Sequence, residues 1–168
     1  MIRKNHKKIL LTVCLLISNL QIWALESDRH QPIEIEADQG SLDKQNQTTV
    51  FSGNVKMRQG TMYMNAAKIT AHKDNAGNQT IIAIGSPATF GQQLEKEGKV
   101  FGKGNNVHYD SQSGIVTITG NAQVNRGGDM ARGAVIVYNT NTEVYTVNAA
   151  KTGRVQVVIQ PQSPTKKK

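Results

Sequence analysis

The chain has 168 residues, of which 38% are hydrophobic and 5% aromatic, and its formal net charge is +8. Its single cysteine, Cys14, lies near the N-terminus, so a scaffold of several disulfides and metal sites built from several thiolates are both excluded. The basic residues do not form a stripe or cluster within the main part of the chain, which argues against a nucleic-acid surface.

The first 24 residues have the pattern of a secretory signal peptide. A basic start precedes an apolar run at 9–17, and Ala24 is a small residue suited to cleavage. The run is much shorter than the ~20 apolar residues that a membrane-spanning helix needs. We therefore predict bacterial export with cleavage near Ala24. Losing the leader reduces the 20 basic residues to 16, against 12 acidic ones, and leaves no cysteine. Residues 162–168 are predicted to be a disordered basic tail.

Residues 25–161 are predicted to form one all-β domain. Apolar and polar residues alternate with the period of a strand, as in 49–58, where Phe51, Val55 and Met57 alternate with polar residues. Turn residues recur at intervals of about 8 to 12, which is typical of a sandwich or barrel. The longest polar connection is expected at 91–104.

Two ten-residue segments resemble each other: FSGNVKMRQG at 51–60 and ITGNAQVNRG at 118–127. When the two segments are aligned at their offset of 67 positions, apolar residues match apolar residues. The same alternate positions of both strands should therefore face the core. Each contains a Gly-Asn pair, Gly53-Asn54 and Gly120-Asn121. Because glycine inside a strand marks a bulge or bend, we predict two related halves that bend at equivalent places.

The apolar positions leave two interpretations of the interior open. Large side chains are scarce, and several apolar positions are alanine. One interpretation is a thin, well-filled sandwich. The other is an interior that stays partly open for an apolar ligand, because these side chains are too small to fill a wide space between sheets.

The sequence offers no catalytic or metal-binding motif. It contains neither a G-x-S-x-G nor a P-loop pattern. His30, His72 and His108 are isolated from one another, and the alternating Glu34, Glu36 and Asp38 are best explained as a solvated strand face. We therefore predict a protein that is not an enzyme and needs no cofactor or metal.

Several segments in order carry a family resemblance: QPIEIEADQGSLDKQNQTTVFSGNV, MNAAKITA, GSPATF, VHYD and VTITGNAQV. Together they resemble the periplasmic lipopolysaccharide-transport family with the OstA-type domain (the LptA family), over about residues 31–161. The resemblance implies an open β-jellyroll of many short antiparallel strands, open at both ends. It also implies a bridge protein that shields lipid A acyl chains and carries lipopolysaccharide from the inner to the outer membrane.

Alternation and the resemblance together suggest the residues of the lipid groove. They are Ile33, Ile35, Phe51, Val55, Met57, Met64, Phe90, Val107, Ile118 and Val124. Simple core packing is the alternative for each of them. Lys73 matches a basic position of the family and is expected at the rim, where it would meet a lipid phosphate; an ordinary solvated lysine is the alternative.

The first and last strands are expected to be open edges that pair with partners. Their residues are Ile33, Glu34 and Ile35 at one edge, and Val155, Val157 and Ile159 at the other. The resemblance implies an inner-membrane, LptC-like partner at the N-terminal edge and an LptD-like translocon domain at the C-terminal edge. Pairing between unlike edges also permits head-to-tail homo-oligomers. A structural periplasmic scaffold that carries no lipid, and a sister member of the same transport system, are the alternative functions.

Overall fold

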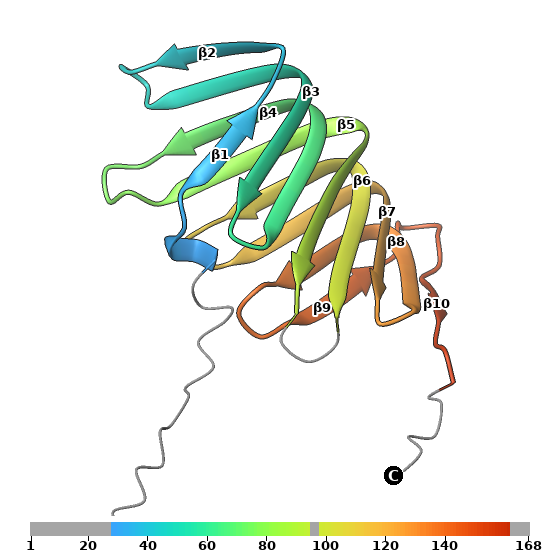
Figure 1. Cartoon of the computed structure of the whole chain (residues 1–168). Helices are drawn as coiled ribbons and strands as arrows, with labels where there is room; N and C mark the ends of the chain where they lie inside the picture. Colours follow the sequence, from blue (N-terminus) through green and yellow to red (C-terminus); the bar gives the residue numbers. More distant parts are fainter. Residues whose placement is uncertain (1–27, 95–97, 162–168) are drawn as a thin grey trace, which may run out of the picture.

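The computed structural model describes residues 28–94 and 98–161, which form one antiparallel sheet (Figure 1). The sheet order is β1-β3-β4-β5-β6-β7-β8-β10, with β2 also beside β3 and β9 also beside β8. The sheet does not close on itself, which confirms the predicted open, all-β architecture. The elements are η1 (Asp28–His30), β1 (Ile33–Glu36), β2 (Gln39–Asp43), β3 (Thr48–Gln59), β4 (Met62–Lys73), β5 (Gln79–Gln93), β6 (Lys99–Asp110), β7 (Ile115–Arg126), β8 (Asp129–Asn139), β9 (Val144–Asn148) and β10 (Gln156–Val158).

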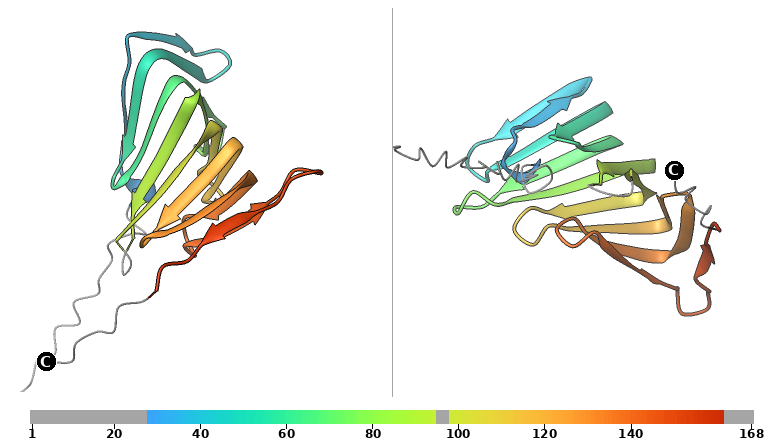
Figure 2. Two further views of the ribbon diagram at one scale, coloured as in Figure 1. Left: turned by 90° about the vertical axis from the view of Figure 1, so that its right-hand side faces the viewer. Right: turned by 60° about the horizontal axis from the view of Figure 1, so that its bottom comes forward.

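The long strands bend sharply in their middles, and the bends line up into a ridge (Figure 2). In β3 the register skips between Ser52 and Val55, and Gly53 and Asn54 have φ of 78° and 46°. Gly120, the repeat of Gly53 in β7, has φ of 74°. Glycine and asparagine adopt this left-handed conformation more readily than other residues. The bends predicted from the repeated Gly-Asn pair are therefore confirmed.

Two arms extend from the ridge, and the space between them is the interior. They are named here after their first strands. The β1 arm contains β1, β10 and residues 55–59, 62–65, 88–93, 99–104, 122–126 and 129–133. The β2 arm contains β2, β9 and residues 48–52, 68–73, 79–84, 106–110, 115–119 and 135–139.

The strand pairing repeats along with the sequence. Val55 pairs with Ala66, and 67 positions later Ala122 pairs with Gly133. Adding 67 to the residue numbers of the β3–β4 pairs gives the β7–β8 pairs. The position at which the register skips is also the same. The two predicted halves are therefore related in structure as well as in sequence.

The terminal strands are divided versions of the central ones. At the same offset, β1 and β2 together take the place of the continuous strand β6. At the other end, β10 takes the place of the second half of β5, since Met64 pairs with Phe90 as Ala131 pairs with Val157. Strand β9 takes the place of the first half of β5. Its residues lie three positions earlier than the offset of 67 predicts, and the connection 149–155 contains the three extra residues.

The expected polar connection at 91–104 is wrong in its extent. Strand β5 runs to Gln93 and β6 begins at Lys99, so only residues 94–98 connect them. Gly102 and Gly104 belong to the sheet and make room for Ile118. A Cβ added at either glycine would lie 2.4 or 2.6 Å from atoms of that side chain. Glycines that suggested a loop are therefore packing sites inside a strand.

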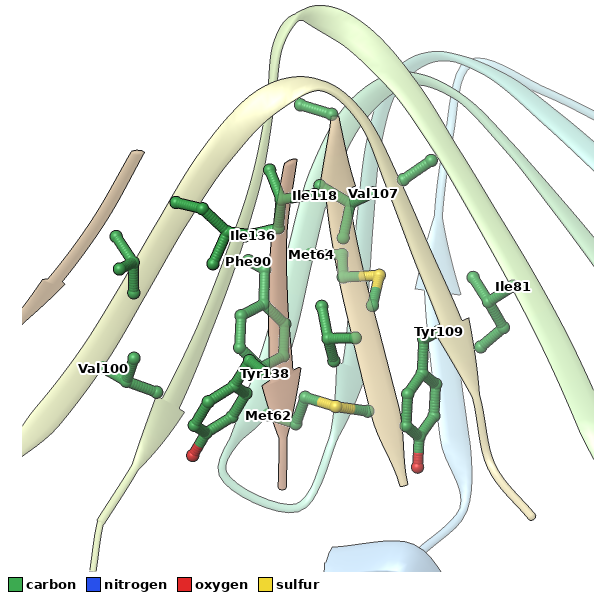
Figure 3. Close-up of a cluster of buried hydrophobic side chains, with 14 of the residues drawn as sticks. Met62, Met64, Ile81, Phe90, Val100, Val107, Tyr109, Ile118, Ile136 and Tyr138 are labelled. Atoms are coloured by element: carbon green, nitrogen blue, oxygen red, sulfur yellow. The ribbon is translucent and has the colours of Figure 1, made fainter. Parts of the chain in front are cut away.

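The core lies between the arms and is apolar. Residues at alternate positions of both arms point into it and are almost fully buried, as Met57, Ile81 and Ile136 are. The rings of Phe90 from the β1 arm and Tyr138 from the β2 arm meet with centroids 5.8 Å apart (Figure 3). Packing of one arm on the other therefore stabilises the bent shape.

Candidate binding groove between the arms

The predicted groove residues all face the space between the arms. In the β1 arm, Val55, Met57, Met64, Phe90 and Val124 are buried. The β2 arm adds two more buried members, Val107 and Ile118. All seven belong to one continuous hydrophobic cluster, several of whose side chains Figure 3 shows. Three further members, Ile33, Ile35 and Phe51, are partly buried against that cluster at its N-terminal end.

The predicted groove residues leave out the two largest side chains of this cluster. Tyr109 and Tyr138 are each 1% exposed, and their hydroxyls point away from the ridge (Figure 3). Alternation could have found them. Tyr109 follows Val107 by two positions, and Tyr138 follows Ile136 by two positions. The remaining unpredicted cluster members are Met62, Ile69, Ile81, Ala83, Ala88, Leu94, Val100, Val116, Ala122, Ala131 and Ile136.

Opposite the ridge, the free ends of the two arms meet along a line that we call the mouth. Polar side chains from both arms line a cavity of about 10 Å³ there, among them Gln59, Gln92 and Tyr109. Such a space is about the size of one water molecule. Gln92, though 4% exposed, accepts a hydrogen bond from the Tyr138 hydroxyl across the mouth, at 3.2 Å. The mouth is therefore a polar margin around an apolar interior.

The short turn η1 covers the N-terminal part of this mouth. Asp28 is 5% exposed, and its carboxylate accepts hydrogen bonds from the backbone N–H and the hydroxyl of Thr61, at 2.9 and 2.5 Å. Gly60 leaves room for it, because a Cβ there would lie 2.2 Å from the carboxylate. Asp28 thus anchors the segment before β1 to the β3–β4 turn.

An ion pair joins the arms in the C-terminal part of the mouth. Arg126, at the end of β7 in the β1 arm, donates to the backbone carbonyl of Glu143 and to its carboxylate, the latter at 3.3 Å. Glu143 lies in the turn between β8 and β9 of the β2 arm. Burial raises the pKa of the nearby Tyr138 phenol; the charge of Glu143 adds to that rise and the charge of Arg126 opposes it. These groups therefore form one electrostatic cluster.

Lys73 lies at the end of β4, on the same face as Ile69 and Ala71 by alternation. Its side chain is exposed, and its backbone N–H donates to the carbonyl of Gln47 at 3.0 Å. The structure thus places Lys73 at the mouth end of the β2 arm, on the inward-facing side of its strand. Its binding role stays a prediction.

Four of the six predicted edge residues, Ile33, Glu34, Ile35 and Val157, lie on strands with one free side. Among the described strands, β1, which contains Ile33, Glu34 and Ile35, pairs only with β3. At the other end, β10 pairs with β8 alone within residues 28–94 and 98–161, and its Val157 is 51% exposed. Val155 and Ile159 flank β10 and are exposed as well.

Two predicted segments, the signal peptide at 1–24 and the basic tail at 162–168, lie outside the described residues. Within the described ranges, no helix is long and apolar enough to cross a membrane. Over the same ranges, no three or more His, Cys, Asp or Glu side chains gather in a way that could hold a metal ion.

An unclosed sheet of bent strands with an apolar interior and a free edge at each end defines the β-jellyroll class of binding proteins. The chain belongs to the family of LptA and LptD N-terminal-domain lipopolysaccharide transport proteins, whose model matches residues 34–144. The family resemblance of the sequence is therefore confirmed.

Named relatives and a solved structure agree with this assignment. The chain is 34% identical to the lipopolysaccharide export system protein LptA of Haemophilus influenzae over 92% of this chain and 91% of that protein. It is 32% identical to LptA of Escherichia coli K12, over 94% and 86%. The crystal structure of LptH from Pseudomonas aeruginosa, a periplasmic component of the lipopolysaccharide transport device, superposes with a TM-score of 0.75 at 28% identity, covering 80% of this chain and 99% of that one.

Proposed function

We propose that this protein is a periplasmic carrier that binds lipopolysaccharide between its two arms and passes it from the inner to the outer membrane. The observation that carries the proposal is the continuous apolar cluster between two arms of an unclosed sheet, in a chain of the lipopolysaccharide transport family. Each buried methylene gains about 0.8 kcal/mol, so an acyl chain of about a dozen carbons gains roughly 10 kcal/mol before costs. The role requires no catalytic step and no cofactor.

Lipid entry requires the arms to separate. The groove residues pack against each other in this structure, so acyl chains have to replace contacts between the arms. Along the ridge the two arms are joined by continuous backbone, whereas at the mouth they meet through side chains, as in the Tyr138–Gln92 hydrogen bond. Opening at the mouth therefore breaks fewer contacts than opening at the ridge. Methionines such as Met57 and Met64 suit the change, since flexible thioethers adapt to chains of irregular shape.

The free edges supply the contacts of a bridge. Strands β5 and β6 pair in the centre of each chain, where Phe90 lies opposite Gly102. The equivalents of these two residues at the ends are Val157 and Ile35. A second copy that places its β1 on the free side of β10 therefore repeats the central pairing, with Val157 opposite Ile35. In the other arm, Ala83 pairs with Val107 within one chain. The equivalent pair between two copies is Val147 of β9 opposite Gly40 of β2.

Charge supports pairing between unlike ends. The N-terminal edge presents Glu34, Glu36 and Asp38, whereas the connection before β10 carries Lys151 and Arg154. All five are exposed. Opposite charges steer the two ends together, and like charges disfavour pairing between two N-terminal edges.

The family resemblance suggests the other partners of these edges. An LptC-like inner-membrane protein takes the β1 and β2 edge, and an LptD-like periplasmic domain takes the β9 and β10 edge. The family model itself includes the LptD N-terminal domain, so a partner of the same fold can offer an equivalent edge. Export to the periplasm requires the signal peptide predicted at 1–24, with cleavage near Ala24.

Site-specific photocrosslinking in intact cells tests the carrier role, with the probe at Ile35 or at Glu36. Along β1, Ile35 is partly buried and inward, while Glu36 is exposed and outward. We expect lipopolysaccharide to crosslink to position 35 and not to position 36. Silence at both positions in an exported, folded protein would contradict lipid carriage and leave a purely structural scaffold.

A further inference from the structure

The outer face of the β1 arm contains an open depression, which we call the outer depression. Its volume of about 480 Å³ is in the range of small-ligand sites. The side chains that line it alternate along their strands with buried residues such as Met57, Met64 and Val100, so they point away from the interior. They belong to Lys56, Arg58, Tyr63, Asn65, Gln93 and Lys99.

An aromatic ring lies on the floor of the outer depression. Tyr63 pairs with Gly91, and a Cβ on that glycine would lie 2.3 Å from two carbon atoms of the tyrosine ring. The ring therefore lies across Gly91, and it is only half-buried. The face of an aromatic ring carries partial negative charge, so it attracts the C–H groups on the face of a sugar ring.

Two amides beside this ring offer hydrogen-bond acceptors. The amide nitrogen of Asn65 donates to the hydroxyl of Thr89 at 3.3 Å, and that of Gln93 donates to the carbonyl of Gly98 at 2.6 Å. Within residues 28–94 and 98–161, the side-chain oxygens of Asn65 and Gln93 accept no hydrogen bond. These oxygens can therefore accept from sugar hydroxyls.

The cations of the outer depression are available to a ligand. Lys56, Arg58 and Lys99 are exposed. Glu36 lies opposite Lys56 and Glu34 opposite Arg58 in the β1–β3 register. In the part of the chain that the structure describes, none of the three cations forms an ion pair with these or other carboxylates. An aromatic ring, amide oxygens and unpaired cations together fit an anionic saccharide.

The second half of the molecule shows that the fold does not require these groups. At the offset of 67, the positions of Lys56, Arg58 and Tyr63 are taken by Gln123, Asn125 and Met130. These residues have the same register and lie on the same outer face, but they carry no charge and no aromatic ring. The chemistry of the outer depression is therefore particular to the N-terminal half.

The outer depression adjoins the mouth. Gln92 lines both the outer depression and the small polar cavity of the mouth, and Thr61 of the β3–β4 turn also lines the outer depression. A lipid whose acyl chains occupy the interior leaves its headgroup at the mouth. In lipopolysaccharide, the saccharide next to lipid A is anionic because it carries phosphates and acidic sugars. Pairing of copies through the strand edges leaves this outer face uncovered.

We propose that the outer depression binds the anionic saccharide of the same lipopolysaccharide molecule whose acyl chains lie between the arms. Lys56, Arg58 and Lys99 bind its acidic groups, and Tyr63 stacks on a sugar ring. This inference rests on the proposed carrier function and adds a saccharide contact to it. The interior recognises acyl chains by burial alone, so the outer depression supplies specificity for the headgroup.

The test is equilibrium binding of two lipids to protein purified from the periplasm of expressing cells. The probes are rough lipopolysaccharide, which retains its core saccharide, and the lipid A of the same lipopolysaccharide without that saccharide. We expect the unaltered protein to bind rough lipopolysaccharide about tenfold more tightly, the size of a few exposed ion pairs. A triple variant, Lys56→Gln with Arg58→Gln and Lys99→Gln, should lose this preference and keep its affinity for lipid A.

The matched control removes the same amount of charge elsewhere. Lys44, Lys68 and Arg132 are exposed and lie outside the outer depression. The triple variant with glutamine at these three positions should keep the preference. Equal loss of the preference in both triple variants would show attraction by overall charge and would overturn the site.

The outcomes also separate this inference from the carrier function. Binding of neither lipid by the unaltered protein would overturn both. If the unaltered protein binds the two lipids equally, the carrier function stands and the saccharide site is wrong. Vesicles of phosphatidylglycerol, which lack saccharide, should not distinguish the unaltered protein from the Lys56, Arg58 and Lys99 variant. Vesicle binding that this variant loses would make the outer depression a membrane-docking surface and overturn the proposal.

A second variant tests the stacking contact without changing charge. Tyr63→Leu keeps an apolar cover over Gly91 but removes the π face, so we expect the preference for rough lipopolysaccharide to fall about threefold. Affinity for lipid A should stay the same. A preference that survives this change in full would contradict the role of Tyr63, even if the triple variant fails to fold.

Discussion

The centre and the ends of the sheet use the same strand pattern with opposite outcomes. Strand β5 crosses the ridge as 15 continuous residues and β6 as 12, each paired on both sides. Their counterparts at the ends are divided into short strands, β1 and β2 at one end and β9 and β10 at the other. A partner on each side stabilises a sharply bent strand, because hydrogen bonds hold the backbone before and after the bend. With one partner, the strand breaks at the corner.

The divided ends also solve the problem of an exposed sheet edge. Short edge strands that carry charge resist unspecific pairing, and β1 has four residues of which two are glutamate. A partner with a flat edge can cover one arm only. A partner with the same bend covers both arms at once, so the shape of the corner selects for chains of the same fold.

The largest expected difference between the centre and the ends is in the free energy of unfolding that is lost when a core-facing side chain is shortened. Phe90 is 1% exposed and touches the opposite arm through Tyr138, so Phe90→Ala should lower the free energy of unfolding by about 3–5 kcal/mol. Ile35 is partly buried on an edge strand, and Ile35→Ala should cost about 1 kcal/mol, because roughly half as much apolar surface is lost. Urea unfolding of both variants in dilute solution measures the two costs. Equal losses would show that the ends are packed as firmly as the centre.

The next effect should fall on assembly and leave the fold intact. Val157 is 51% exposed and takes the position of Phe90 at the C-terminal end, so Val157→Lys places a charge at the proposed interface. We expect head-to-tail association to weaken at least about tenfold, because the ammonium would be buried opposite Ile35 without a partner. The melting temperature in dilute solution should stay unchanged. Sedimentation velocity over a range of concentrations measures the association.

Val158→Lys is the matched control for this change. Val158 is the next residue of the same strand, points to the outer face, and would lie opposite Glu34 of the neighbouring copy. A lysine there should preserve or strengthen association through a cross-strand pair of opposite charges. If both variants assemble like the unaltered protein, β10 is not the contact edge.

The sequence predicted the faces and bends of the strands but not their neighbours across the interior. Alternation and the repeated Gly-Asn pair depend on local backbone chemistry. The buried face of Val55 and Met57 and the bend at Gly120 were therefore predicted correctly. The contacts of the mouth are different. Tyr138 with Gln92 and Arg126 with Glu143 come from opposite arms, and which arm ends meet depends on how sharply every bend folds. No local pattern encodes that angle.

The smallest expected effect compares two repeated turns under acid. Asp110 closes the central β6–β7 turn, and hydrogen bonds from the Ser113 backbone N–H and hydroxyl, at 2.8 and 2.9 Å, lower its pKa from 3.8. Asp43 closes the equivalent end turn, where the side chain of Asn46 donates to it at 2.7 Å and lowers its pKa as well. Because both values are depressed by folding, the stabilisation is present above about pH 4 and is lost as the pH falls through the folded values.

Asp110→Asn should therefore reduce the melting temperature at pH 5 by more than it does at pH 3, because pH 3 lies below the ordinary pKa of 3.8 and part of the stabilisation is already lost there. Asp43→Asn should show the same trend with a smaller amplitude, because an end strand opens locally before the molecule unfolds. Thermal scans of both variants at the two pH values measure the difference. A larger pH-dependent loss for Asp43→Asn would mean that the β2–β3 turn unfolds together with the centre, and the division of the terminal strands would then not make the ends less stable.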